Sequence, residues 1–148
     1  MAIIFHKNEA GVEEIVSHFN SCAPEFLQGI KKQTSIENYS QKIHSLARRF
    51  EAWDGENLVG LVAAYYNAKL QKAFITNVSI LPLYQSRGIG SHLLKWCIEN
   101  LFLLGAVDIG LEVLNDNERA KRLYASHGFF PLSRNDNSMY MICYYNKD

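Results

Sequence analysis

The sequence predicts a mixed α/β (α+β) fold, with a central, mostly antiparallel sheet of about six to seven strands and about four flanking helices. Three consecutive strands, at 50–53, 58–67 and 72–80, are separated by short turns, which indicates an antiparallel meander. After Pro82 the pattern changes to a β-α-β-α order. No repeat or linker interrupts this order, so residues 1–148 are expected to form one domain.

The first third of the chain is expected to hold one strand and two helices. An apolar stretch at 2–5 predicts the strand, and apolar residues at helical spacing predict helices at 12–20 and 36–49. Between them, residues 21–35 mix Pro24 and Gly29 with two lysines. We interpret this segment as an irregular crossing or short helical turns.

The turns and the second half complete the predicted order. Asp54-Gly55 suits a tight hairpin turn because glycine tolerates a positive φ, and residues 68–71 form a second turn. The helix predicted at 91–104 is apolar nearly all round, which indicates burial against a sheet. The remaining predicted elements are a strand at 108–113, a helix at 117–127 and strands at 129–132 and 139–145.

Charge and composition exclude several classes of protein. Fifteen Lys and Arg balance fifteen Asp and Glu, whereas nucleic-acid binders usually carry a clear cationic excess. The longest apolar run, 58–66, is half of the roughly 18 residues that a membrane-spanning helix needs. The N-terminal segment carries Glu9, Glu13 and Glu14 where a signal peptide would be basic and then apolar. We therefore expect a cytoplasmic protein that binds neither nucleic acid nor membrane.

The cysteines and histidines indicate no structural metal site. Cys22, Cys97 and Cys143 are odd in number and far apart, so neither a disulfide framework nor a zinc knuckle is predicted. The five histidines are scattered. Cys97 lies on the apolar helix, where an inert core thiol is favoured over a nucleophile.

Residues 85–91, Gln-Ser-Arg-Gly-Ile-Gly-Ser, lie between a predicted strand and the long helix. Two glycines let the backbone turn sharply and let a ligand approach main-chain amides. The helix that follows directs its unsatisfied N–H groups and its dipole to the same place, which favours phosphate. A Rossmann fingerprint would need a third glycine where Leu93 stands, and a Walker A loop would need Lys after Gly90. Two interpretations remain. One is a loop that binds a pyrophosphate, such as that of coenzyme A, through its backbone, and the other is a plain strand-to-helix turn.

The segment resembles the signature of the GCN5-related N-acetyltransferase (GNAT) family, Gln/Arg-x-x-Gly-x-Gly/Ala after a strand. Gln85, Gly88 and Gly90 match it. A second block of sequence is similar to the family's downstream signature. The residues of this block that match are Leu111-Glu112-Val113, Asn117, Ala120, Leu123-Tyr124 and Gly128-Phe129. The two signatures together lie within residues 72–132.

The resemblance implies an acetyl-CoA-dependent N-acetyltransferase without a metal. It implies that the Val78 N–H polarises the thioester carbonyl and that Tyr124 protonates the departing thiolate, which makes these two residues the expected catalytic pair. It also implies that the main chain of Asn77, Val78 and Ile80 pairs with the pantetheine arm. We therefore expect the sheet to split between the strands at 72–80 and 108–113 and to open a cleft for that arm. The implied coenzyme-binding residues are Val78, Ile80, Gln85, Arg87, Gly88, Ile89, Gly90, Ser91, Asn117 and Tyr124.

Structural interpretations of the same residues stay open. Tyr124 also suits a core aromatic residue, and Asn117 a helix N-cap alone. The Arg87 side chain also suits a solvated position, with only its backbone in use. Arg119, Lys121 and Arg122 form a basic stretch that suits either the 3′-phosphate or a solvated helix face.

The general base is not identified by spacing. The histone-modifying branch of the family uses a strand glutamate eleven residues before the motif glutamine, and here that position is Phe74. Histone-type substrates are therefore not expected. The candidate bases are Glu112, Asn77 acting through a water, His44, Glu37, Tyr65 and Tyr66, with a water chain to bulk as a further route.

The acceptor is expected to lie opposite the coenzyme, against residues 22–50 and 60–77. That region is mildly basic and contains Tyr39, Tyr65 and Tyr66, which favours a small amine on a neutral or anionic molecule, such as an amino sugar or amino acid. A protein or peptide amine, a non-catalytic acyl-CoA-binding domain and a module for another phosphate ligand are the alternatives. Monomer and homodimer both stay open. The basic residues counted are Lys31, Lys32, Lys42, Arg48 and Arg49.

Overall fold

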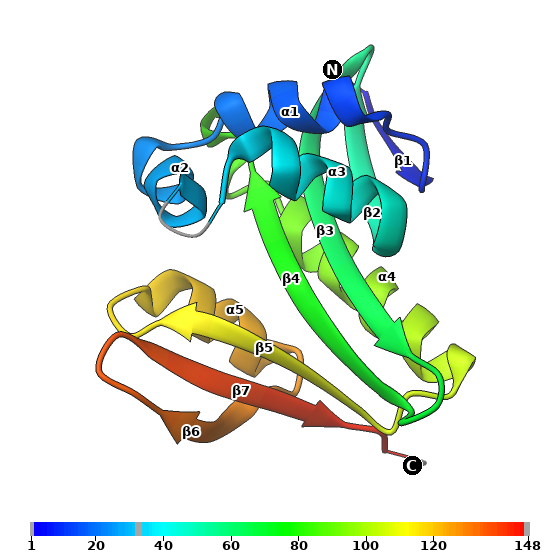
Figure 1. The fold of residues 1–148 in the computed structure, drawn as a ribbon, viewed down its shortest axis with the longest axis vertical. Helices are drawn as coiled ribbons and strands as arrows, with labels where there is room; N and C mark the ends of the chain where they lie inside the picture. Colours follow the sequence, from blue (N-terminus) through cyan, green and yellow to red (C-terminus); the bar gives the residue numbers. More distant parts are fainter. Residues whose placement is uncertain (1, 32–33, 147–148) are drawn as a thin grey trace.

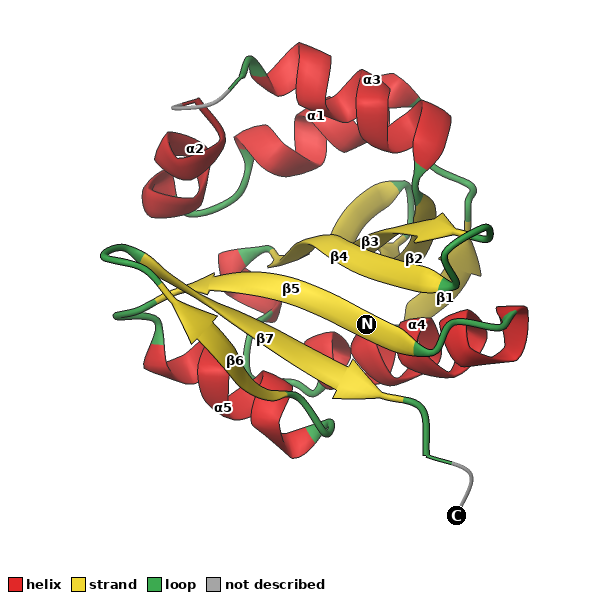
Figure 2. Cartoon of the chain, turned by 60° about the horizontal axis from the view of Figure 1, so that its bottom comes forward, coloured by secondary structure: helices red, strands yellow, loops and turns green. Residues whose placement is uncertain are grey.

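The computed structural model describes residues 2–31 and 34–146, which form a seven-stranded sheet with helices on both faces (Figures 1 and 2). The strand order is β1-β2-β3-β4-β5-β7-β6. Neighbouring strands are antiparallel except β4 and β5, which are parallel. The predicted sheet is confirmed. Its strands are β1 Ile3–Lys7, β2 Arg48–Asp54, β3 Asn57–Asn67, β4 Lys72–Ile80, β5 Asp108–Leu114, β6 Phe130–Arg134 and β7 Ser138–Tyr144.

Helices cover the two faces unequally, as Figure 2 shows. Helices α1, α2 and α3 lie on one face, and α4 and α5 lie on the other. A single 3-10 turn, Pro82–Tyr84, connects β4 to the loop before α4. The helices are α1 Val12–Asn20, α2 Pro24–Lys31, α3 Ile36–Leu46, α4 Ile89–Leu104 and α5 Glu118–Ser126.

The described residues thus contain five α-helices where about four were expected, and the additional one is α2. Pro24 occupies its first position, where the missing N–H costs no helical hydrogen bond. Phe26, Leu27 and Ile30 place an apolar stripe against the core. Pro24 therefore starts a helix in the segment interpreted as an irregular crossing or short helical turns. Residues 32–33 of that segment lie outside the described residues.

Two helix boundaries differ from prediction by more than one residue. Helix α3 ends at Leu46 instead of 49, because Ala47 is extended and Arg48 already belongs to β2. Helix α4 begins at Ile89, two residues early, because Gly88 adopts the left-handed conformation that turns the chain into the helix.

Each face of the sheet has its own core. One cluster packs α4 against the sheet through residues such as Leu93, Leu94 and Leu101. The other packs α1 and α3 against it through residues such as Phe19 and Ile43. All five of these side chains are fully buried, so both layers are fixed by apolar contact.

The sheet splits between β4 and β5. Their ladder joins only Lys72–Phe74 to Asp108–Gly110, and the strands diverge beyond it (Figure 1). The predicted split is confirmed.

A bulge on β4 lies just past this ladder. Ala63 pairs with Asn77 and Ala64 pairs with Ile75, so Thr76 is the extra residue. The bulge changes which side chains of β4 point to each face of the sheet. Ala73 and Ile75 belong to the α4 core, and after the bulge Val78 and Ile80 take that side while Ser79 contacts α1.

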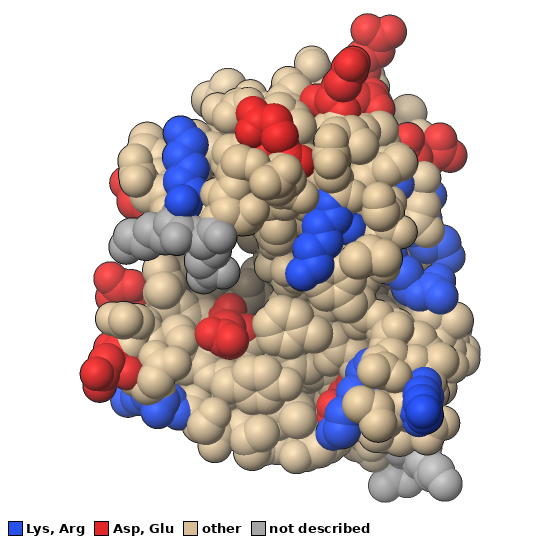
Figure 3. Space-filling model, viewed as in Figure 1, with Lys and Arg blue, Asp and Glu red and all other residues tan. Residues whose placement is uncertain are grey.

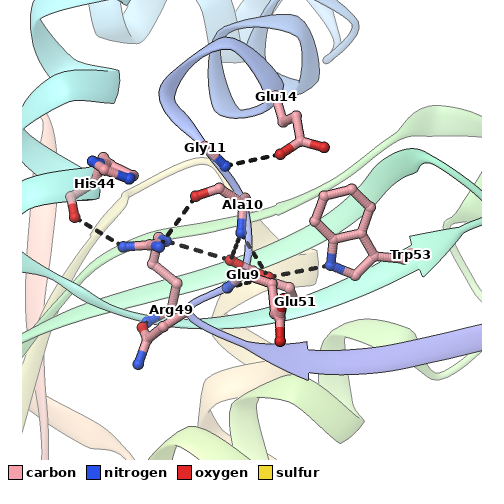
Figure 4. A network of polar contacts seen from close by, with 9 residues as sticks. Glu9, Ala10, Gly11, Glu14, His44, Arg49, Glu51 and Trp53 are labelled. Atoms are coloured by element: carbon pink, nitrogen blue, oxygen red, sulfur yellow. Dashed lines mark hydrogen bonds and ion pairs between the residues drawn. The ribbon is translucent and has the colours of Figure 1, made fainter.

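A buried ion pair ties the start of α1 and the end of α3 to β2 (Figure 4). Glu51 is fully buried, and its carboxylate accepts hydrogen bonds from Arg49 Nε, Trp53 Nε1 and the backbone N–H groups of Glu9 and Ala10. Arg49 also donates to the carbonyl oxygens of His44 and Ala10. Arg49 therefore adds no free positive charge to the acceptor region, contrary to the sequence-based count.

Candidate active site

A cavity of about 620 Å³ lies where β4, the start of α4 and α5 meet. Of the ten residues predicted to bind the coenzyme, nine line this cavity, and the side chain of Arg87 instead lies over the Tyr84 ring at 5.3 Å. The structure thus brings together residues that are up to 46 positions apart, Val78 and Tyr124. The nine are Val78, Ile80, Gln85, Gly88, Ile89, Gly90, Ser91, Asn117 and Tyr124.

The loop before α4 has the conformation of an anion cradle. Gly88 has a φ of 81°, in the region that favours glycine. A Cβ at Gly90 would lie 3.6 Å from Ile80 and 3.9 Å from Leu123, both ordinary contact distances. The internal packing therefore does not require glycine at 90, whereas a ligand approaching the backbone there would. The first N–H groups of α4 have no intrahelical partner, and they and the helix dipole favour a negative charge at this end.

Arg119 on α5 holds this loop in place. Its Nη1 donates to Gln85 Oε1 at 3.0 Å, and its Nη2 donates to Ser86 Oγ at 3.0 Å. Gln85 in turn donates to the Ile80 carbonyl oxygen at 3.1 Å. The sequence left Arg119 between a phosphate ligand and a solvated residue. The structure shows a third role, a brace between α5, the loop and β4.

Tyr124 lines the cavity and is 8% exposed. Its ring packs edge-on against Phe129, with the centroids 6.1 Å apart. Burial raises the pKa of Tyr124 to about 12, so the hydroxyl keeps its proton at neutral pH. The side chain is therefore a core aromatic residue that also lines the cavity and carries a protonated hydroxyl.

Asn117 is the N-cap of α5 and also lies on the cavity wall. Its side-chain oxygen accepts a hydrogen bond from the Ala120 N–H at 3.1 Å, which is an N-cap of α5. The residue also lines the cavity. The cap thereby fixes the first turn of α5 beside the cavity.

A row of aromatic side chains crosses the opposite side of the split, below α3. Tyr39 on α3 donates to the Thr76 carbonyl oxygen at 2.8 Å. Tyr65 pairs with Phe74 across β3 and β4, and the Phe74 ring stacks with Tyr140 of β7 at 6.5 Å between centroids. We call Tyr39, Tyr65, Phe74 and Tyr140 the aromatic row. Figure 3 shows that the molecule is hollowed between the helices and the lower strands.

Gly110 lets Tyr140 lie flat across β5. A Cβ at Gly110 would lie 1.7 Å from the Tyr140 hydroxyl, an impossible contact. Neither residue can be singled out from sequence alone, because the contact depends on the register of β5 against β7.

One cation and one carboxylate flank the aromatic row. Lys42 Nζ lies 5.3 Å from the centroid of the Tyr65 ring. Glu112 is exposed, lies opposite Tyr140 in the β5–β7 register and accepts a hydrogen bond from Ser138 Oγ at 3.2 Å. The acceptor side therefore presents both charge signs. Lys32, counted in the basic set, lies outside the described residues.

The structure separates the candidate bases. Tyr66 donates to the Leu104 carbonyl oxygen and packs against the α4 core, away from the aromatic row. Tyr65 belongs to the aromatic row, but burial raises the pKa of its hydroxyl, which keeps the hydroxyl protonated. His44 and Glu37 are exposed on α3. Glu112 is thus the carboxylate that lies beside the row.

The part of the chain that the structure describes contains no group of three or more His, Cys, Asp or Glu side chains arranged to hold a metal ion. Among the same residues, no helix is both long and apolar enough to span a membrane.

The fold and the cavity are those of an acyl-CoA-dependent transferase, and comparison with known proteins gives the family. The family model described as Acetyltransferase (GNAT) family matches residues 12–129. The chain belongs to this family, as its two sequence signatures predicted.

A curated relative is the [Ribosomal protein bS18]-alanine N-acetyltransferase of Salmonella typhimurium, 40% identical over 60 residues. The match spans 40% of this chain and 40% of that relative.

Solved structures share the whole fold at low sequence identity. The ribosomal-protein-S18-alanine N-acetyltransferase from Escherichia coli has a TM-score of 0.80 at 19% identity, covering 97% of this chain and 94% of that one. The PaiA N-acetyltransferase from Thermoplasma acidophilum, in complex with coenzyme A, has a TM-score of 0.76 at 18% identity, covering 98% and 100%. At these identities the likeness supports the fold and not the acceptor.

Proposed function

We propose that the chain transfers an acetyl group from acetyl-CoA directly to a primary amine. The observation that carries the proposal is the cavity at the split of the sheet, where the anion cradle of α4, the unpaired part of β4 and Tyr124 meet. Membership of an acetyltransferase family and a relative solved with coenzyme A support it.

The coenzyme would be held mainly by main-chain groups. The backbone amides from Arg87 to Ser91 would bind the pyrophosphate at the start of α4. The pantetheine arm would lie along Val78 and Ile80, where β4 has no β5 partner. Asn117 on α5 would border it from the other side.

The reaction then follows from the groups around the thioester. The lone pair of the neutral amine attacks the carbonyl carbon, and the developing oxyanion accepts a hydrogen bond from the Val78 N–H. Collapse of the intermediate breaks the C–S bond, and Tyr124 donates its proton to the departing sulfur and regains one from solvent. The amine loses one proton to Glu112 or to water. The products are an amide and coenzyme A with a free thiol.

The proposed acceptor is a small primary amine on a neutral or anionic molecule, such as an amino sugar or an amino acid. The aromatic row offers flat apolar surfaces on which a sugar ring can stack. Lys42 beside Tyr65 offers a partner for an anionic group, and Glu112 offers one for the amine.

A second acceptor class is the α-amine of a polypeptide. The curated relative is named for the alanine of ribosomal protein bS18, and this observation favours a protein amine. The matched segment covers 40% of the chain, so most of the chain lies outside it.

Release of free thiol from acetyl-CoA tests the proposal. The amines to compare are glucosamine, free alanine and a short peptide with N-terminal alanine, with mass spectrometry of each product. Preference for glucosamine or alanine supports the small-amine acceptor, and preference for the peptide supports the second class. Coenzyme A binding without thiol release on any of them would favour the non-catalytic acyl-CoA-binding alternative.

A further inference from the structure

One residue of the loop before α4 has an unusual backbone conformation. Ser86 has a φ of 65°, in the left-handed region where a residue with a Cβ is strained. Among the described residues, two other non-glycine residues have a positive φ, Asn8 and Gln71, but only Ser86 lines the cavity. A strained residue on the wall of a ligand cavity points to a functional role for its conformation.

The conformation of Ser86 is held from outside the loop. Among the described residues, no hydrogen bond to the main chain of Ser86 fixes it. Arg119 on α5 instead donates through Nη2 to Ser86 Oγ and through Nη1 to Gln85 Oε1, both at 3.0 Å. Gln85 in turn donates to the Ile80 carbonyl oxygen of β4. The planar guanidinium thus binds two successive side chains of the loop, in a geometry that an ammonium group does not offer.

The φ of Ser86 determines where the main-chain amides of the loop point. Ser86 lies between Gln85, which is tied to β4, and Gly88, whose left-handed φ of 81° turns the chain into α4. A different φ at Ser86 would redirect the segment that carries the N–H groups of Arg87 and Gly88. These groups belong to the proposed pyrophosphate site. A loop already held in the binding conformation binds its ligand at a lower entropic cost.

A direct contact with the coenzyme is the other role open to Arg119. Its side chain also lines the cavity, and a guanidinium has five N–H donors, of which Gln85 and Ser86 use two. The two contacts with the loop favour positioning, and the two roles differ in what a glycine at position 86 would do. Glycine takes a positive φ without strain, so it replaces a brace but cannot replace a phosphate ligand.

We infer that Arg119 is a positioning residue for the coenzyme, which holds Ser86 in the left-handed conformation and thereby presets the pyrophosphate loop. This inference rests on the proposed function, because the coenzyme is taken to bind at this loop. An exposed side chain of α5 then sets the affinity for a ligand that main-chain groups before α4 bind.

Calorimetric titration of coenzyme A into paired variants tests the brace. Arg119→Met removes the donors, and the dissociation constant should rise by about fivefold or more. Adding Ser86→Gly to Arg119→Met should bring it back to within about twofold of the parent value. The matched control adds Gln71→Gly to Arg119→Met. Gln71 also has a positive φ, 56°, but lies in the turn between β3 and β4, so this change should recover no affinity.

Two further titrations separate the brace from a charge or phosphate contact. Arg119→Lys keeps the positive charge without the planar fork, so it should lose affinity as Arg119→Met does. Dephospho-coenzyme A, which lacks the 3′-phosphate, should show the same fold-loss as coenzyme A. Parent affinity in Arg119→Lys, a loss confined to coenzyme A, or no recovery by Ser86→Gly would each overturn the inference.

NMR without coenzyme reads the conformation of Ser86 itself. The NOE between the amide hydrogen and the Hα of one residue is strong only at positive φ. For Ser86 it should be strong in the parent protein and weak in Arg119→Met. Equal NOEs in the two proteins would overturn the positioning role and leave the acetyltransferase proposal intact.

The outcomes separate the inference from the function on which it rests, because its measurements are of binding and conformation. A parent protein that binds coenzyme A but acetylates none of the amines would contradict the proposed transfer, and the titrations would still decide the role of Arg119. A parent protein that binds no coenzyme A would overturn both proposals.

Discussion

The coenzyme half and the acceptor half of this molecule are built by different means. The coenzyme half, β4-α4-β5-α5, presents a cavity whose lining residues lie in three short stretches of sequence, 78–80, 84–91 and 117–124. The acceptor half depends on side chains from α1, α3, β3, β4 and β7 that meet only in the folded chain. A constant ligand suits a backbone site, whereas a site made of side chains can be changed one residue at a time.

The largest expected effect is on the free energy of unfolding and comes from the buried Glu51 network. It tests how far the fold of the acceptor half depends on this ion pair. Glu51→Gln keeps the shape but leaves the Arg49 charge buried without its partner, which should lower the free energy of unfolding by about 3 kcal/mol. Urea denaturation measures this loss. Glu56→Gln, an exposed change, should have almost no effect. A loss below about 0.5 kcal/mol in Glu51→Gln would contradict the structural role of the ion pair.

The cradle is tested by Gly90→Val. A branched side chain between Ile80 and the loop would block the backbone amides, so the coenzyme A dissociation constant should rise about 100-fold, or about 3 kcal/mol. Isothermal calorimetry measures it. Gly29→Val is a matched control, since a Cβ there meets nothing within 4 Å. Unchanged affinity in Gly90→Val would exclude the loop as the coenzyme site.

The buried His18 gives the acceptor half a specific acid sensitivity. Its pKa is lowered to about 4, so the unfolded chain binds this proton at a higher pH than the folded chain. Stability from this group is present above about pH 6.5 and is lost as the pH falls toward 4. Between pH 7 and 4.5 the parent protein should lose about 2 kcal/mol more than His18→Gln in urea denaturation. Equal losses would contradict the neutral, buried imidazole.

Tyr124→Phe gives the smallest of these effects, at least tenfold in turnover, because it removes the acid and keeps the ring. Coenzyme A affinity should change less than threefold. Tyr144→Phe, an exposed change, is the control. With a pKa of about 12, Tyr124 should cause no fall in rate between pH 6 and 9. An undiminished rate in Tyr124→Phe across that range would make the residue structural.

The predictability of the two halves from sequence follows the same division. The motif at Gln85–Gly90, the block around Asn117 and Tyr124 and the strand before the motif are each local, so nine of the cavity-lining residues could be identified from the sequence. Glycine and helix-start chemistry act within a few positions, and their spacing can be recognised without knowledge of the fold.

The acceptor half could not be predicted in this way. His18 and Ser79 are 61 positions apart, and their contact depends on how α1 packs on β4. Tyr65 and Tyr66 point to opposite faces because neighbours in a strand alternate, and the Thr76 bulge sets which face β4 offers the acceptor. Arg49 was counted as basic surface, and only the folded structure places Glu51 beside it.

A crystal structure with coenzyme A bound tests the central claim most directly. The account predicts the pyrophosphate on the amides of Arg87–Ser91, the pantetheine along Val78 and Ile80 between β4 and β5, and the sulfur beside the Tyr124 hydroxyl. Coenzyme A bound elsewhere, for example across the aromatic row below α3, would contradict the assignment of the two halves.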